Sequence, residues 1–113
     1  MNVFRKLKAM LILREAIKLA NEIYTDNPQR YFVMPTTDGK LSVMTKKEFR
    51  TLKRKHYINK EATNFDLMRE CFYFTPDRGG NDAITDDLRK RKSKQYMRWC
   101  EAYSKMKSMR KKR

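Results

Sequence analysis

A chain reversal that runs directly into a helix start, within residues 31–54, most constrains how this sequence can fold. Two short strand-like runs, residues 31–34 and 41–44, flank a turn that contains Asp38 and Gly39. An Asp-Gly pair supplies the positive φ that a tight antiparallel reversal needs. The sequence therefore predicts a β-hairpin. Because a lone hairpin is marginal in water, it must pack on a helix or gain a third strand.

The residues after the hairpin carry the start signal of a helix. Thr45 and Glu48 have the spacing of a capping box, in which each side chain accepts a hydrogen bond from the backbone N–H of the other residue. We expect a basic helix to begin at Lys46, with Phe49 and Leu52 turned toward the core. Most of its other positions are Lys or Arg.

The N-terminal segment has the spacing of an amphipathic helix that ends at Asn27-Pro28, because the residue before proline is disfavoured in the helical conformation. We expect one side of this helix to be buried. That side carries apolar residues at intervals of three or four positions: Val3, Leu7, Met10, Leu13, Ile17, Ala20 and Tyr24.

The apolar run at residues 71–74 fits either a third strand that extends the hairpin or the end of a short helix, and periodicity does not separate the two. Residues 75–82 have the composition of a loop. Thr85, followed by two aspartates, fits the start of a C-terminal helix.

The C-terminal segment is basic and carries an aromatic stripe that is more typical of a core than of a ligand platform. Residues 89–94 have no apolar face, so we expect an exposed helical turn, a loop, or a new helix that starts at Ser93. Residues 105–113 are mostly basic, and we expect them to be disordered without a polyanion. The stripe consists of Tyr96, Trp99, Tyr103 and Met106.

These elements predict one α+β domain over residues 1–109 and a basic tail over residues 110–113, because 113 residues suffice for one modest core. The expected order is an N-terminal amphipathic helix, the β-hairpin with an optional third antiparallel strand, a basic middle helix and a basic C-terminal helix. Cys71 and Cys100 have no metal-binding spacing, and we interpret them as reduced core thiols. No apolar run reaches the roughly 18 residues of a membrane span, so we expect a cytoplasmic or virion-associated protein.

Charge is the strongest indication of function. The chain has 28 Lys and Arg against 13 Asp and Glu, a net charge of +15, which indicates a polyanionic partner. Residues 46–60 carry seven basic groups against one acidic group, and residues 83–113 carry twelve against three. We expect both zones to form one surface that binds the phosphate backbone of DNA or RNA. The predicted contact residues are Lys46, Lys47, Arg50, Lys53, Arg54, Lys55, Arg89, Arg91 and Lys92.

No catalytic, metal or cofactor motif stands out, so we expect a non-enzymatic protein. The one histidine, His56, lies in a basic run without a spaced carboxylate partner, and we interpret it as a surface or phosphate-contacting group. A rival hypothesis is a protein-interaction or virion component that docks on an acidic partner protein, which requires an exposed apolar patch rimmed by charge. A distant third is a metal-dependent nuclease, which requires convergence of Asp66, Glu70, Asp77 or Asp82.

Three runs of the sequence resemble parts of small basic uncharacterised proteins encoded by gut Bacteroidales and their phages. They are RYFVMP at residues 30–35, GKL at residues 39–41 and FRTLKRKHYI at residues 49–58. The resemblance covers about residues 10–75 and includes no diagnostic motif. It implies an accessory role in a phage or mobile element, and it carries over no functional residues.

Overall fold

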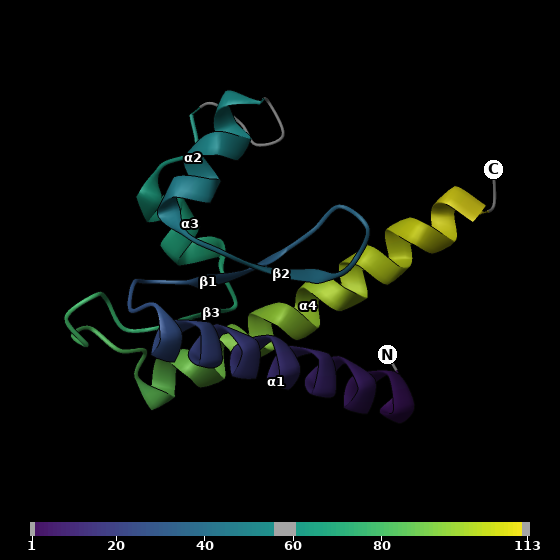
Figure 1. Cartoon of the computed structure of the whole chain (residues 1–113). Helices are drawn as coiled ribbons and strands as arrows, with labels where there is room; N and C mark the ends of the chain where they lie inside the picture. The colour runs from purple at the N-terminus through teal and green to yellow at the C-terminus, as the bar shows by residue number, and fades with distance from the viewer. Residues whose placement is uncertain (1, 56–60, 112–113) are drawn as a thin grey trace.

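A computed structural model describes residues 2–55 and 61–111 of the chain (Figure 1). Their arrangement is α+β, as predicted, with a three-stranded antiparallel sheet in the strand order β2-β1-β3. The elements follow the expected order, with one short extra helix before the third strand. They are α1 (Val3–Asp26), β1 (Phe32–Pro35), β2 (Leu41–Met44), α2 (Lys46–Arg54), α3 (Asn64–Glu70), β3 (Tyr73–Phe74) and α4 (Asp86–Lys111).

The predicted hairpin forms between β1 and β2, with Phe32 paired to Met44 and Val33 to Val43. Its turn needs glycine at position 39 for two reasons. Gly39 has a φ of +85°, and a Cβ placed there would lie 2.6 Å from a ring carbon of Tyr103 on α4. The turn is therefore matched both to its own geometry and to the helix beside it.

Both interpretations of the apolar run at residues 71–74 have a counterpart in the structure, since a short helix ends just before the run and a third strand lies within it. The helix α3 ends at Glu70, and the two residues of β3 pair with β1 on the side opposite β2. The backbone N–H of Phe72 donates to the carbonyl of Val33, and that of Thr75 donates to Tyr31, so the pairing extends slightly beyond β3. The third strand gives the hairpin the support that it lacks alone.

The sheet separates two apolar clusters, because successive residues of a strand point to opposite faces. On one face, Val33 and Tyr73 pack with buried residues of α1 and with Tyr96 of α4. On the other face, Phe32 and Phe74 pack with Phe49 of α2 and with residues of α3. In Figure 1, α1 therefore lies below the sheet, and α2 and α3 lie above it.

The helix α4 is continuous from Asp86 to Lys111, which confirms the helical alternative for residues 89–94 and corrects the expected disorder of the residues that follow. No loop or new helix start occurs at Ser93, and the predicted disorder over residues 105–113 is wrong for residues 105–111. Residues 112–113 lie outside the described part. Tertiary contacts support the continuity, because the centre of the Phe72 ring lies 5.1 Å from that of Tyr96 and 5.9 Å from that of Trp99. The predicted cap is confirmed, since the Thr85 hydroxyl accepts a hydrogen bond from the backbone N–H of Leu88 at 3.2 Å.

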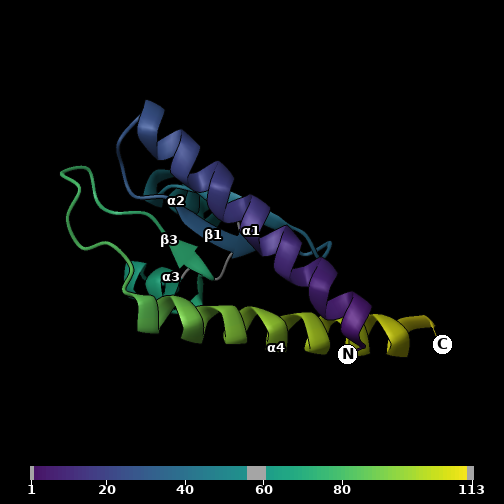
Figure 2. The same ribbon diagram turned by 90° about the horizontal axis from the view of Figure 1, so that it is seen from below.

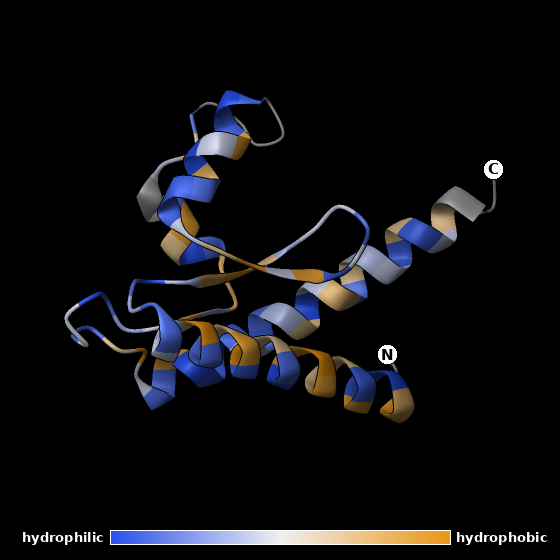
Figure 3. Cartoon of the chain, in the orientation of Figure 1, coloured by the Kyte–Doolittle hydropathy of each residue, from blue (hydrophilic) through white to orange (hydrophobic). Residues whose placement is uncertain are grey.

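The predicted buried stripe of α1 is confirmed in its C-terminal half, where Leu13, Ile17 and Ala20 are buried, and is wrong in its N-terminal half. Val3, Leu7 and Met10 belong to the predicted buried stripe, yet they are 70%, 55% and 54% exposed. Figure 2 shows the reason, because the N-terminal half of α1 runs away from the sheet toward the C-terminal half of α4. Apolar residues nevertheless continue along the whole of α1 (Figure 3). The residues of α1 that are buried are Ala9, Leu13, Ile17 and Ala20.

Candidate functional site

The orientation of α2 is fixed at its start and along its inner side. The Thr45 hydroxyl accepts a hydrogen bond from the backbone N–H of Glu48 at 3.2 Å, and the Glu48 carboxylate accepts one from the backbone N–H of Thr45 at 3.4 Å. The predicted capping box is therefore confirmed. Phe49 is buried in the cluster above the sheet, and Leu52 packs against the same cluster. The basic side of α2 is consequently directed outward.

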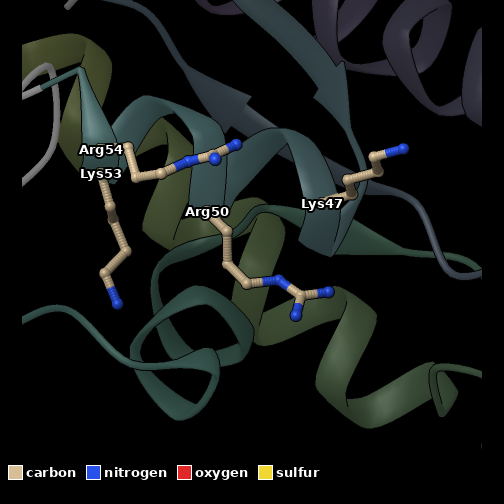
Figure 4. Close-up of a pocket in the computed structure, with 4 residues that line it drawn as sticks. All are labelled: Lys47, Arg50, Lys53 and Arg54. Atoms are coloured by element: carbon tan, nitrogen blue, oxygen red, sulfur yellow. The ribbon is translucent and has the colours of Figure 1, made fainter.

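Four cationic side chains of α2 line one hollow of about 700 Å³. They are Lys47, Arg50, Lys53 and Arg54, and no carboxylate is among the described residues that line this hollow. Figure 4 shows the four side chains extending away from the helix. Here we call these four residues the α2 cluster. Two further predicted residues flank it, since Lys46 is the first residue of α2 and Lys55 follows its end, both exposed.

The local contacts of the α2 cluster leave most of its charge unpaired. Within the described part of the chain, none of the four side chains forms an ion pair. Arg54 donates to the Thr51 hydroxyl at 3.4 Å, and the Lys53 ammonium lies 5.8 Å from the centre of the Phe49 ring. The positive charge of Lys53 also acts on the Asp66 carboxyl of α3. The pKa of Asp66 is lowered mainly by a hydrogen bond from the backbone N–H of Thr63, with Lys53 contributing less.

Lys92 does not belong to the candidate site, which corrects the sequence prediction. Its side chain is buried, and its ammonium donates to the carbonyls of Met68 at 2.8 Å and Cys71 at 2.7 Å. These carbonyls lie at the C-terminal end of α3, where a helix has unpaired acceptors and partial negative charge. Gln95 donates to the carbonyl of Glu70 at 3.1 Å. Lys92 and Gln95 thus fasten α3 to α4.

The remaining predicted residues of α4 do not join the α2 cluster either. The Arg89 guanidinium lies 5.5 Å from the centre of the Tyr73 ring, on the face of the sheet that packs on α1. Arg91 is exposed on α4. In Figure 1 the start of α4 lies below the sheet, whereas α2 lies above it. The two basic zones therefore do not merge into the single surface that the sequence predicted.

A second surface, which the sequence pattern did not predict, lies on the exposed side of α1. Phe4 is 84% exposed, and Leu11, Ile12 and Leu19 are between 42% and 56% exposed. None of these four residues belongs to the stripe that was predicted to be buried. The signal was present as a seven-residue spacing, which separates Phe4 from Leu11 and Ile12 from Leu19.

The four acidic residues considered for a metal site have other partners or lie apart. Asp66 accepts the backbone N–H of Thr63 at 2.8 Å, and Asp77 accepts those of Gly79 and Asn81 at 3.0 and 2.8 Å. Among the described residues, no group of three His, Cys, Asp or Glu side chains could hold a metal ion. His56 lies outside the described residues.

Comparisons with known proteins add no assignment. No protein-family model matches the sequence, and no curated protein or solved structure shows a significant match to it. Within residues 2–55 and 61–111, no helix is both long enough and apolar enough to cross a membrane.

Proposed function

We propose that this protein is a non-enzymatic, nucleic-acid-binding accessory protein that contacts the phosphate backbone through α2. The observation that carries the proposal is the α2 cluster, in which four Lys and Arg side chains of one helix line one hollow. Each cation that neutralises a phosphate releases condensed counterions, which favours binding. The resemblance noted in the sequence suggests a phage or mobile-element setting, in the cytoplasm or in a virion.

The start of α2 provides a second argument. Lys46 and Lys47 lie in the first turn of α2, where the helix dipole disfavours a cation by about 0.3–1 kcal/mol at low salt. A bound phosphate offsets that cost, whereas an isolated protein gains nothing from it. Lys53 and Arg54 lie in the last turn, where the dipole favours cations. The cluster therefore extends over the full length of α2 despite an electrostatic cost at one end.

The chemistry of α2 favours contact with the backbone over readout of bases. Sequence is read mainly by Arg, Asn and Gln side chains that enter a groove and form paired hydrogen bonds with base edges. The helix α2 contains no Asn or Gln, and its five polar side chains other than Glu48 and Thr51 are the α2 cluster and its neighbour Lys46. Weak sequence preference and steep salt dependence are the expected properties.

Docking on an acidic partner protein is the second candidate function, and a different surface favours it. The exposed apolar side chains of α1 match the apolar patch that partner docking requires, although Glu15 and Glu22 beside them disfavour an acidic partner. The described residues that line the hollow at the α2 cluster are all Lys or Arg. The two candidate functions therefore make separate demands on α1 and α2.

The test compares two variants that lose the same net charge. In the first, Arg50, Lys53 and Arg54 of α2 are replaced by Gln, and in the second, Lys90, Lys94 and Lys105 of α4 are replaced by Gln. Gln keeps a good helix propensity. We expect the α2 variant to bind a fluorescent 20-base-pair duplex at least about tenfold more weakly at about 50 mM salt, a loss of ~1.4 kcal/mol. The affinity of the α4 variant for the same duplex should fall by less than about threefold.

The same anisotropy titration with single-stranded DNA and with structured RNA tests backbone contact, because it should show the same ranking. Equal losses in both variants would assign binding to net charge and not to α2. A wild-type protein that binds none of the three nucleic acids at about 50 mM salt would refute the proposal.

A further inference from the structure

The exposed side of α1 is unusually apolar for a surface that has no partner in the described chain. Seven apolar side chains, spread over about 200° of the circumference of α1, together expose on the order of 600 Å². Covering such surface contributes about 25 cal/mol per Å². The seven side chains, all at least 42% exposed, are Val3, Phe4, Leu7, Met10, Leu11, Ile12 and Leu19.

Four of these residues, together with Lys8 and Glu15, form one narrow strip along α1. At 100° per residue they span an arc of about 100°, on the side away from the buried Ala9, Leu13 and Ala20. The strip contains three pairs of residues, each seven positions apart, so that both members of a pair lie on nearly the same line. These pairs are Phe4 with Leu11, Lys8 with Glu15, and Ile12 with Leu19.

The strip has the same chemistry when it is followed in either direction from a point between Leu11 and Ile12. An identical helix laid antiparallel about that point places Phe4 opposite Leu19 and brings Leu11 and Ile12 close to the twofold axis. It also places Lys8 opposite Glu15. Each of these contacts occurs twice, because a twofold interface repeats every pair. From this self-complementarity we propose that α1 pairs with α1 of a second copy of this chain, in antiparallel orientation, to form a homodimer.

Charge supports a second copy over other occupants. The helix α1 has five basic and three acidic residues, a net charge of +2, whereas α4 has ten basic and three acidic residues. Self-association through α1 therefore brings together a weakly charged part of a strongly basic chain. An anionic membrane surface or an acidic helix gains nothing from Glu15 and Glu22, which lie in or beside the strip.

The shape beside the strip also suits the second copy. A hollow of about 630 Å³ lies between α1 and the hairpin, and Ile12, Leu19 and Leu41 are among its lining residues. The antiparallel arrangement brings the Phe4 ring of the second copy next to Leu19, at the mouth of this hollow. The proposed dimer does not rest on the proposed function of α2.

The test measures the mass of the full chain by sedimentation equilibrium, without nucleic acid, from about 1 to 100 μM at about 300 mM salt, which screens the net charge. We expect a reversible rise from 13.7 kDa toward twice that mass. Lys8→Glu alone and Glu15→Lys alone should each weaken dimerisation about tenfold, because each creates two like-charge contacts. The double variant should return to within about threefold of the wild type, because the contacts are re-formed with exchanged signs.

Two further variants make the result decisive. Lys6→Glu changes the net charge as Lys8→Glu does but lies outside the strip, so it should leave dimerisation within about threefold of the wild type. Leu11→Glu should abolish the dimer while circular dichroism shows an intact fold, because Leu11 is 56% exposed.

Three outcomes would overturn the proposal: a wild-type chain that stays at 13.7 kDa, a dimer that none of the strip variants weakens, or a double variant that fails to recover. Binding of a monomeric chain to phosphatidylserine vesicles, lost in Leu11→Glu, would overturn it in favour of a lipid-binding face.

Discussion

The placement of Lys92 shows how a cation in a basic run can belong to the core. Its ammonium has the carbonyls of Met68 and Cys71 as acceptors and lies 5.9 Å from the centre of the Phe74 ring. A buried ammonium is tolerated when its donors are satisfied in this way. The composition of residues 89–94 hides this role. The spacing reveals it, because Lys92 lies four residues after Leu88 and four before Tyr96, both of which face inward.

Replacement of Lys92 by Met should therefore affect stability and not ligand binding. We expect Lys92→Met to lower the free energy of unfolding by about 2–3 kcal/mol, because carbonyls at the end of α3 lose a charged donor. Urea unfolding followed by circular dichroism measures the change. The affinity for duplex DNA, measured where the variant is folded, should stay at the wild-type value.

The control is Lys90→Met, which removes the same charge from an exposed position of α4 and should change stability by no more than about 0.5 kcal/mol. A Lys92→Met variant with wild-type stability and weakened DNA binding would restore Lys92 to the site and contradict the structure.

At the scale of the elements, the sequence predicted best where local signals decide. The hairpin turn and the starts of α2 and α4 depend on a few adjacent residues, such as Gly39, Thr45 and Thr85, and all three were predicted correctly. The buried side of α1 was predicted correctly only in its C-terminal half, because apolar residues such as Leu11 and Leu13 occur on both sides of the helix. The packing partner decides which side is covered, and no local signal identifies that partner.

The helix α3 is the other element that local signals could have identified. Thr63 and Asp66 form a second capping box, in which Asp66 accepts the backbone N–H of Thr63 at 2.8 Å and the Thr63 hydroxyl accepts that of Asp66 at 3.2 Å. The T-x-x-D spacing is visible in the sequence. The apolar run at residues 71–74 is the more conspicuous signal in this part of the sequence. For α3, the sequence predicted only the alternative of a short helix that ends at residues 71–74.

The capping box of α3 should make the stability of the fold depend on pH. The pKa of Asp66 lies below its ordinary value of 3.8, mainly because the backbone N–H of Thr63 donates to its charged form. A carboxyl with a lowered folded pKa adds stability above its unfolded pKa, and this stability is lost as the pH falls through the folded pKa. Asp66→Asn should therefore lower the urea midpoint at neutral pH. This difference from the wild type should close in strong acid.

Asp38→Asn provides a comparison within the same fold, because the pKa of Asp38 is lowered chiefly by the Thr36 hydroxyl in the hairpin turn and not by a helix start. A midpoint difference for Asp66→Asn that stays constant from neutral pH into strong acid would contradict the role given to the Asp66 carboxylate.

At the scale of the whole molecule, the distribution of charge along the sequence did not predict its distribution in space. The sequence placed the two basic zones on one surface, but the sheet lies between α2 and the start of α4 (Figure 1). Four of the nine predicted contact residues, those of the α2 cluster, line one hollow, and Lys92 is buried. Which basic segments meet is decided by long-range packing of helices on a sheet, and net charge per segment carries no information about it.

The dependence of DNA affinity on salt tests the role of the α2 cluster most directly, because it counts phosphate contacts. For B-DNA, the slope of log K against log salt concentration is about −0.9 per neutralised phosphate. Between about 50 and 300 mM salt, the slope of the Arg50, Lys53 and Arg54 triple variant should be shallower than that of the wild type by about 2.7. The Lys90, Lys94 and Lys105 triple variant should change the slope by less than about 1. Equal slopes for the wild type and the α2 variant would contradict phosphate binding by α2.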